Sequence, residues 1–198
     1  ALFTLYYRDD AEVFARALIA KGWRVLASRE TCEYLRKKGV ASIELSAYVR
    51  IKEDYGFPPT LHPKVEAGLT GNSRSRIDLV YATSYPAGVG NDIGGRALLA
   101  LAAKGGRIPV MDAPDMRRVI AAMGRTGNIP ACLRRELIEK AYFSFARHLG
   151  GFTGGSGRYA AVFGEQAQQL MNGENPYQQP AYLFSDKSGD PFSLGASR

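Results

Sequence analysis

The chain has 198 residues, 45% of them hydrophobic, which is enough to enclose a core in one domain that carries an appendage. The net charge of +7 suits an anionic ligand, but Lys and Arg are scattered along the chain, which argues against a nucleic-acid-binding module. No stretch approaches the roughly 18 to 20 apolar residues of a membrane span, and no signal-peptide pattern is present, so we expect a cytoplasmic protein without membrane contact.

The first forty residues predict the order strand, helix, strand, helix. Residues 2–7 and 24–27 are short β-rich runs, and residues 31–38 have a helical pattern. Asp9 or Asp10 is expected to cap the helix between the two strands. That helix is predicted to turn one apolar face inward, with Val13, Phe14, Ala17 and Leu18.

The same alternation continues further along the chain. Residues 77–82 and 108–111 are compact apolar strands, and residues 96–104 form a helix rich in Ala and Leu. Pro114 marks another helix start, and a long amphipathic pattern runs over residues 130–149. Strands that alternate with single helices predict a three-layer α/β fold, with a mostly parallel sheet covered by helices on both faces.

The composition changes near residue 150. Residues 150–157 are rich in glycine, so we place the α/β domain at residues 1–150 and a helical or extended appendage at residues 151–198. Within the appendage, residues 160–171 have a short helical pattern. Because the appendage has no obvious core of its own, we expect a homodimer.

The cysteines give little evidence of chemistry. Cys32 and Cys132 are the only two, and neither has another Cys or a His at metal-ligand spacing. We therefore expect no metal site, and we expect both thiols to be reduced and buried.

Several short motifs follow one another over most of residues 1–184, and their order along the chain is informative. They are Phe14-Ala15-Arg16, Ala27-Ser28 with Thr31, Thr60-Leu61-His62-Pro63, Tyr85-Pro86, Asp92-Ile93-Gly94-Gly95, Ala102-Ala103-Lys104 and Gly173-Glu174-Asn175-Pro176. In this order they resemble the IMP cyclohydrolase domain of the bifunctional purine biosynthesis enzyme (AICAR transformylase/IMP cyclohydrolase), which has a methylglyoxal-synthase-like fold. The last motif resembles the stretch that leads into the transformylase domain.

The resemblance implies an IMP cyclohydrolase. Such an enzyme closes the purine ring of 5-formamidoimidazole-4-carboxamide ribonucleotide (FAICAR) to IMP with loss of water, and it uses no metal or organic cofactor. By resemblance the catalytic residues are Lys104, Tyr85 and Asp92. By the same resemblance, the residues that bind the purine ribonucleotide are Ser28, Thr31, Thr60, Thr83, Ser84, Ile93, Gly94 and Gly95. Arg8, Arg29 and Lys64 are added to this set as basic residues that could bind the anion where the sequence departs from the family.

Position along the chain is compatible with these roles, since ligands of open α/β sheets collect beyond the carboxyl ends of strands. Each residue also has a structural explanation. Lys104 suits the dipole at a helix C-terminus, and Asp92 could cap the helix that follows it. Tyr85 could anchor a loop, and His62 is expected to be a turn residue bonded to the backbone.

The sequence also departs from the family pattern. Pro59 and Phe57 stand where the family has a lysine and a basic residue, and Arg29 and Glu30 replace a pair of glycines. The alternatives that stay open are a stand-alone cyclohydrolase, the N-terminal fragment of a bifunctional enzyme, and a noncatalytic nucleotide-binding domain of the same fold.

Overall fold

The computed structural model describes residues 1–51, 59–71, 75–85, 94–124, 127–153 and 161–185. The chain divides into two compact units, Ala1–Phe145 and Ala146–Arg198, and each is described by itself. The boundary expected at residue 150 falls inside helix α7 (Ala131–Thr153). Among the described residues, no helix has both the length and the apolar character that crossing a membrane needs.

The first unit contains one five-stranded parallel sheet with the strand order β3-β2-β1-β4-β5. The first strand of the chain lies at its centre, where Leu2 pairs with Leu26 on one side and with Val80 on the other. The strands are β1 (Leu2–Leu5), β2 (Leu26–Ala27), β3 (Ile43–Glu44), β4 (Leu79–Thr83) and β5 (Ile108–Val110).

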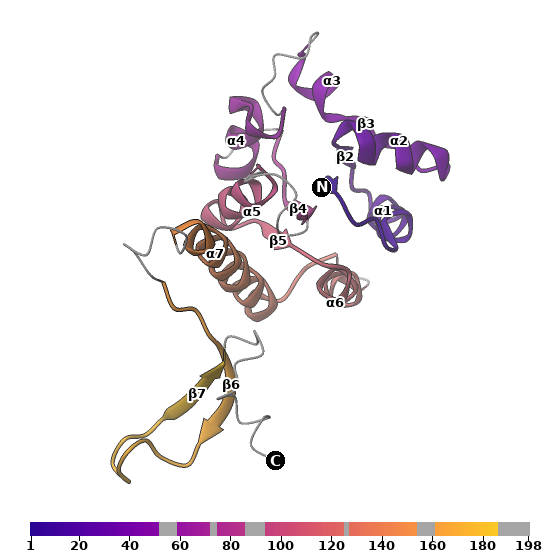
Figure 1. Ribbon diagram of the computed structural model, residues 1–198. Helices are drawn as coiled ribbons and strands as arrows, with labels where there is room; N and C mark the ends of the chain where they lie inside the picture. Colours follow the sequence, from indigo (N-terminus) through magenta and orange to yellow (C-terminus); the bar gives the residue numbers. More distant parts are fainter. Residues whose placement is uncertain (52–58, 72–74, 86–93, 125–126, 154–160, 186–198) are drawn as a thin grey trace. The chain divides into compact units, whose positions relative to one another are not determined.

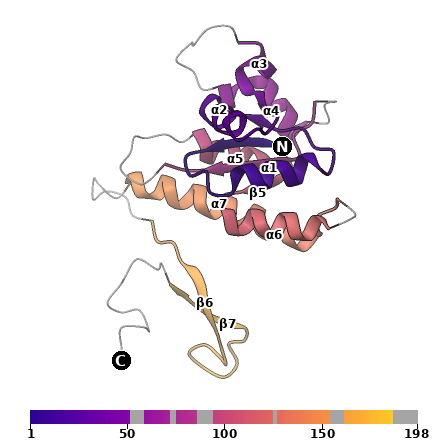
Figure 2. The same ribbon diagram turned by 90° about the vertical axis from the view of Figure 1, so that its right-hand side faces the viewer.

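Helices cover both faces of this sheet, as the alternation of elements predicts. Helices α1 and α6 lie on one face, and α4 and α5 lie on the other (Figure 1). Helices α3 and α4 lie toward one end of the unit, away from α6 (Figure 2). Besides α7, the helical elements are α1 (Ala11–Ile19), α2 (Arg29–Lys37), α3 (Leu45–Val49), the 3-10 turn η1 (Pro59–Leu61), α4 (Pro63–Thr70), α5 (Gly94–Lys104) and α6 (Ala113–Met123).

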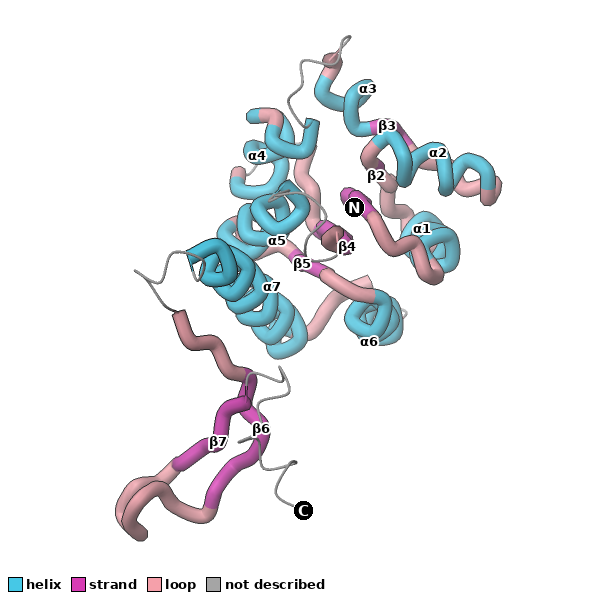
Figure 3. Tube along the Cα trace, viewed as in Figure 1, coloured by secondary structure: helices cyan, strands magenta, loops and turns pink. Residues whose placement is uncertain are grey.

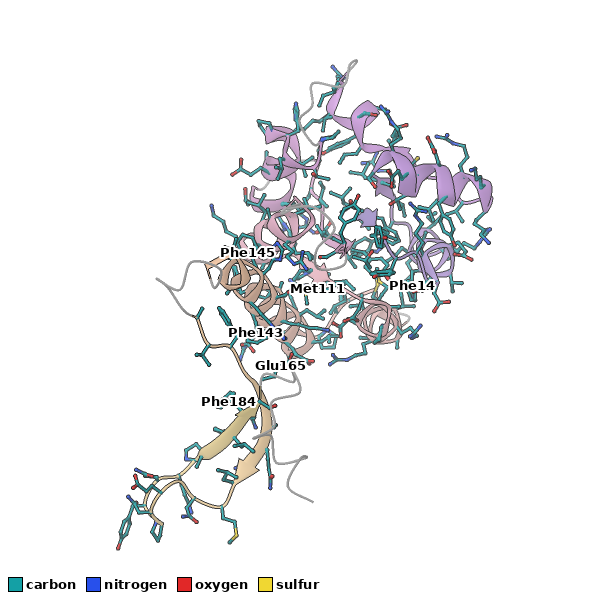
Figure 4. The ribbon with its side chains drawn as sticks, viewed as in Figure 1. Phe14, Met111, Phe143, Phe145, Glu165 and Phe184 are labelled. Atoms are coloured by element: carbon teal, nitrogen blue, oxygen red, sulfur yellow. The ribbon has the colours of Figure 1, made fainter. Side chains whose placement is uncertain are left out.

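Alternate strand residues point to opposite faces and separate the core into two clusters. In β4, Tyr81 packs with the cluster under α1 and α6, whereas Val80 packs with the cluster under α4 and α5. The ring of Tyr81 meets the rings of Phe3 and Phe14 edge to face, with centroids 5.3 and 6.0 Å apart. Phe14 points from α1 toward the sheet (Figure 4).

Two expectations about α1 are corrected. Val13 is 56% exposed, because the buried stripe of this helix consists of Ala11, Phe14, Ala15 and Leu18. Asp10 occupies the N-cap position in the left-handed conformation, but its side chain does not cap the helix. Its carboxylate instead accepts a hydrogen bond from Arg117 at 2.6 Å.

The expectation for the cysteines is half right. Cys32 is fully buried in α2, but Cys132 is exposed at the start of α7. The inward stripe of α7 begins with Leu133 and continues at Leu137, so its neighbour at 132 faces outward.

The second unit contains an antiparallel hairpin of β6 (Glu165–Leu170) and β7 (Ala181–Ser185), drawn in magenta in Figure 3. The helix expected over residues 160–171 is therefore wrong. Residues 165–170 pair with residues 181–185 through their backbones, and this pairing outweighs the helix propensity of the Gln and Ala residues in β6.

Candidate functional site

A cavity of about 250 Å³ lies beyond the carboxyl ends of the central strands β1 and β4, at the edge of the sheet where α/β proteins bind ligands. The start of α2, the turn η1 and the start of α5 complete its walls. The lining residues are Thr4, Leu5, Tyr6, Ser28, Arg29, Glu30, Pro59, Thr60, Thr83, Ser84, Tyr85, Gly94, Gly95 and Arg96.

The N-terminus of α2 opens onto this cavity without a side-chain cap. Ser28 occupies the N-cap position, but its hydroxyl bonds Thr31 Oγ1 at 3.0 Å and caps no backbone N–H. In contrast, the N-caps of α4 and α6, His62 and Asp112, accept backbone N–H groups at 3.1 and 2.8 Å. The leading N–H groups of α2 therefore remain available to an anion.

His62 thus has the structural role that the sequence predicts for it. Its Nδ1 accepts the N–H of Lys64, so the imidazole holds the first turn of α4. The side chain of Lys64 is also engaged elsewhere, since its ammonium donates to the carbonyl of Tyr48 and lies 4.3 Å from the centre of the Tyr48 ring. Lys64 does not line the cavity.

Two of the predicted binding hydroxyls have partners inside the protein. Thr31 is fully buried, and its Oγ1 accepts the N–H of Leu5 at 3.0 Å, which ties α2 to the central strand. Thr83 Oγ1 accepts the N–H of Tyr7 at 2.9 Å and donates to the Tyr7 carbonyl at 3.0 Å. Both residues therefore support the wall of the cavity.

Other hydroxyls in the wall are available to a ligand. The side chains of Thr60 and Ser84 line the cavity and form no hydrogen bond with other residues in the described part of the chain. Thr4 was not anticipated, although it is the one polar residue of β1, which is the signal that could have identified it. Gly95 borders open space, with no atom within 4 Å of the position of an added Cβ.

The charged groups around the start of α2 pair with one another. Arg29 Nε lies 3.4 Å from Glu44, and Arg8 lies 3.4 Å from the carboxylate of Glu30. The guanidinium of Arg8 also lies over the ring of Tyr34 at 5.8 Å. The acidic Glu30 at the start of α2 is therefore offset by Arg8, but both pairs lie at the surface and so are weak.

Aromatic side chains form the mouth of the cavity. The rings of Tyr6 and Tyr85 are 4.8 Å apart, and Tyr7 meets Tyr6 edge to face at 4.9 Å. All three are more than a third exposed. Tyr6 and Tyr85 line the cavity, so a flat ligand could contact their rings.

Lys104, one of the three residues expected to be catalytic, does not line this cavity. Lys104 is the exposed last residue of α5, and a helix of this length places it about 15 Å from the cavity end at Gly94. Tyr85 does line the cavity. Asp92 and Ile93 lie outside the described residues, as does Phe57.

Within the described ranges, no group of three or more His, Cys, Asp or Glu side chains is placed to hold a metal ion.

The parallel sheet between two helical layers defines a three-layer α/β protein. A comparison with solved structures supports this class. The chain is similar to a crystal structure of ForH, with a TM-score of 0.64, 28% sequence identity, and coverage of 78% of this chain and 97% of that one. No family model matches the sequence.

Proposed function

We propose that this chain is an IMP cyclohydrolase that closes the ring of FAICAR to give IMP. The supporting observation is that one cavity collects the uncapped N-terminus of α2, the Gly94-Gly95 start of α5, and the hydroxyl groups of Thr60, Ser84 and Tyr85. A phosphorylated ribonucleotide is the class of ligand that uses all of these features.

The phosphate would bind at the start of α2. Backbone N–H groups at a helix N-terminus point at an anion and carry the positive end of the helix dipole. Ser28 and Thr60 line the same cavity. The Thr60 hydroxyl can donate to the phosphate, and the Ser28 hydroxyl can do so by turning its proton away from Thr31. This arrangement compensates in part for the missing family lysine at Pro59, because neutral donors replace one charge-assisted contact.

The reacting arms would lie between Tyr85 and the start of α5. The carboxamide nitrogen attacks the formyl carbon, a proton moves from that nitrogen to the formyl oxygen, and the resulting hydroxyl leaves as water with a second proton. The Tyr85 hydroxyl can carry these protons, and the dipole at the start of α5 stabilises charge that develops on the formyl oxygen. Because both arms belong to one molecule, holding them together supplies much of the acceleration.

A second candidate is a noncatalytic nucleotide-binding domain. The position of Lys104 favours it, since the basic group expected to take part in catalysis lies at the far end of α5. The cyclohydrolase and the noncatalytic domain would bind the phosphate through the same contacts at α2. They differ only in whether FAICAR is converted to IMP.

The test follows the absorbance of IMP after FAICAR is mixed with the purified chain, and it measures IMP binding by calorimetry. We expect turnover in the wild type, and in Tyr85→Phe a loss of about 100-fold with IMP binding retained. Binding without turnover would select the second candidate. Absence of both would overturn the two together.

We also propose a homodimer, because the described strands of the second unit bury few side chains. Light scattering at micromolar concentration should give twice the mass of the 21.6 kDa chain, and a monomer would remove this proposal.

A further inference from the structure

A second cavity of about 400 Å³ adjoins the first and shares the side chains of Thr83 and Ser84 with it. Its other walls come from the residues after β1 and from the connection between β5 and α6. Tyr7, Met111 and Pro114 give it apolar and aromatic surfaces, and Met111 lies just past the end of β5 (Figure 4). The function proposed above makes no use of this space.

Tyr81 is the most informative residue of this second cavity. It is only 1% exposed, and the rings of Phe3 and Phe14 pack against it, yet its side chain lines the cavity. Its hydroxyl forms no hydrogen bond with any residue that the structure describes. Because the side chain lines the cavity, this hydroxyl can form a hydrogen bond with a ligand there.

Burial also keeps this hydroxyl neutral. Desolvation raises the pKa of Tyr81 far above its usual value, and the carboxylates of Asp112, Asp9 and Asp10 raise it further. A neutral phenol can accept a hydrogen bond from a ligand as well as donate one.

Most of the carboxylates near the second cavity belong to ion pairs within the protein. Asp10 pairs with Arg117 at 2.6 Å, and Asp112 pairs with Lys140 at 2.7 Å. Asp115, which is almost fully buried, is held by both Lys140 and Arg118. Asp9 lines the cavity and forms no ion pair within the described part of the chain. The cavity therefore favours a cation and disfavours an anion.

We propose that this second cavity binds a small organic cation, in which an ammonium group is carried on an apolar or aromatic body. Asp9 accepts from the ammonium and balances its charge, the Tyr81 oxygen accepts a second ammonium proton, and the body of the ligand packs against Tyr7 and Met111. The proposal does not depend on the chemistry assigned to the first cavity, because none of the groups that hold the ammonium lines that cavity.

The test uses three probes that share a phenyl ring and differ in the polar group. They are 2-phenylethylammonium, 2-phenylethanol and phenylacetate, titrated into the full chain by ligand-observed NMR. We expect the ammonium to bind about tenfold more tightly than the alcohol, since a charge-assisted hydrogen bond is roughly twice as strong as a neutral one. Phenylacetate should bind most weakly. Equal affinities, or no ammonium binding, would overturn the proposal.

Two variants assign the binding to this cavity. Asp9→Asn and Tyr81→Phe should each weaken ammonium binding about 3- to 10-fold. Tyr34→Phe is the matched control, because it removes a tyrosine hydroxyl that bonds Glu12 away from this cavity, and it should leave the affinity unchanged. Unchanged affinity in both Asp9→Asn and Tyr81→Phe would also overturn the proposal.

The same variants separate this proposal from the cyclohydrolase function. Asp9→Asn and Tyr81→Phe should retain IMP binding, whereas Ser28→Ala should weaken IMP binding and leave ammonium binding unchanged. A melting curve for each variant shows that it is folded. If Ser28→Ala changed ammonium binding as strongly as Asp9→Asn, the probe would lie in the first cavity and the proposal would fail.

Discussion

The hydroxyl of Thr83 bonds both backbone groups of Tyr7, accepting its N–H at 2.9 Å and donating to its carbonyl at 3.0 Å. The last residues paired between β1 and β4 are Leu5 and Thr83. The two bonds of the Thr83 hydroxyl therefore extend the connection between these strands beyond the end of the sheet. They also fix the segment that separates the two cavities, because Thr83 lines both of them.

Thr83→Val should therefore destabilise the protein. It removes two hydrogen bonds at a partly exposed site and keeps the shape of the side chain, so we expect a loss of about 1 to 2 kcal/mol in the free energy of unfolding. Urea unfolding followed by circular dichroism measures this loss. Thr83→Ser keeps the hydroxyl and should remain closer to the wild type than Thr83→Val. The reverse order would show that the two bonds contribute nothing.

Thr31 and Ser28 should differ in what they support, although their hydroxyls bond each other. Thr31→Val leaves the buried N–H of Leu5 without its acceptor, which should cost about 1 to 3 kcal/mol of stability. Ser28→Ala should change stability by less than Thr31→Val and should weaken IMP binding instead. Thermal melting and calorimetry on both variants test the contrast, and equal loss of stability in the two would contradict it.

Two glycines at opposite ends of α5 offer another contrast. A Cβ at Gly105, just after the helix, would lie 2.0 Å from the carbonyl oxygen of Leu69, so Gly105→Ala must push backbone apart. We expect it to destabilise the fold by about 1 to 3 kcal/mol or more. Gly95→Ala meets no atom within 4 Å and should fold normally. Any loss of nucleotide affinity in Gly95→Ala would then report contact with the ligand, and melting temperatures that fall equally would refute the contrast.

The Tyr34 hydroxyl donates to the Glu12 carboxylate at 2.7 Å, which predicts a dependence of stability on pH. This bond raises the pKa of Tyr34 from 10.0 to about 12, so its stabilisation is present below pH 10 and is lost between pH 10 and 12. The same bond lowers the pKa of Glu12 below its usual 4.5, so the stabilisation is also lost as acid protonates Glu12. The difference in melting temperature between wild type and Tyr34→Phe should therefore be largest between these limits.

Tyr48→Phe is the control for that titration. The Tyr48 hydroxyl donates to the backbone carbonyl of Ser75 at 3.2 Å, and a carbonyl does not titrate. Its effect on melting should stay constant as the pH falls from neutral to 3. A parallel fall in both variants would mean that Glu12 is not the titrating partner.

The local pattern predicted the elements that bury a clear apolar stripe. The strand at residues 79–83 and the helices α5 and α7 lie within a few residues of their predicted positions. The two-residue strand β3 was missed, because so short an edge strand has no period of its own and forms through pairing with β2. The hairpin β6–β7 was missed because the Gln and Ala residues of β6 favour a helix, whereas the strand forms through its pairing with β7.

The candidate site was predictable where residues follow strands or begin helices. Ser28, Thr60, Ser84, Tyr85 and the pair Gly94-Gly95 all line one cavity. The burial of Thr31 in α2 could not be predicted from its neighbours in sequence, because the residue that it bonds, Leu5, belongs to β1. Lys104 was assigned by resemblance alone, although the helix predicted over residues 96–104 already placed it at the helix end opposite to Gly94 and Gly95.

The central position of β1 has a consequence for synthesis on the ribosome. Leu2 leaves the ribosome well before Val80, which is one of its two neighbours in the sheet. Until β4 emerges, the nascent chain can form only the β3-β2-β1 half of the sheet, whose innermost strand then has an unpaired edge. A chaperone that shields this edge during translation should raise the yield of folded protein.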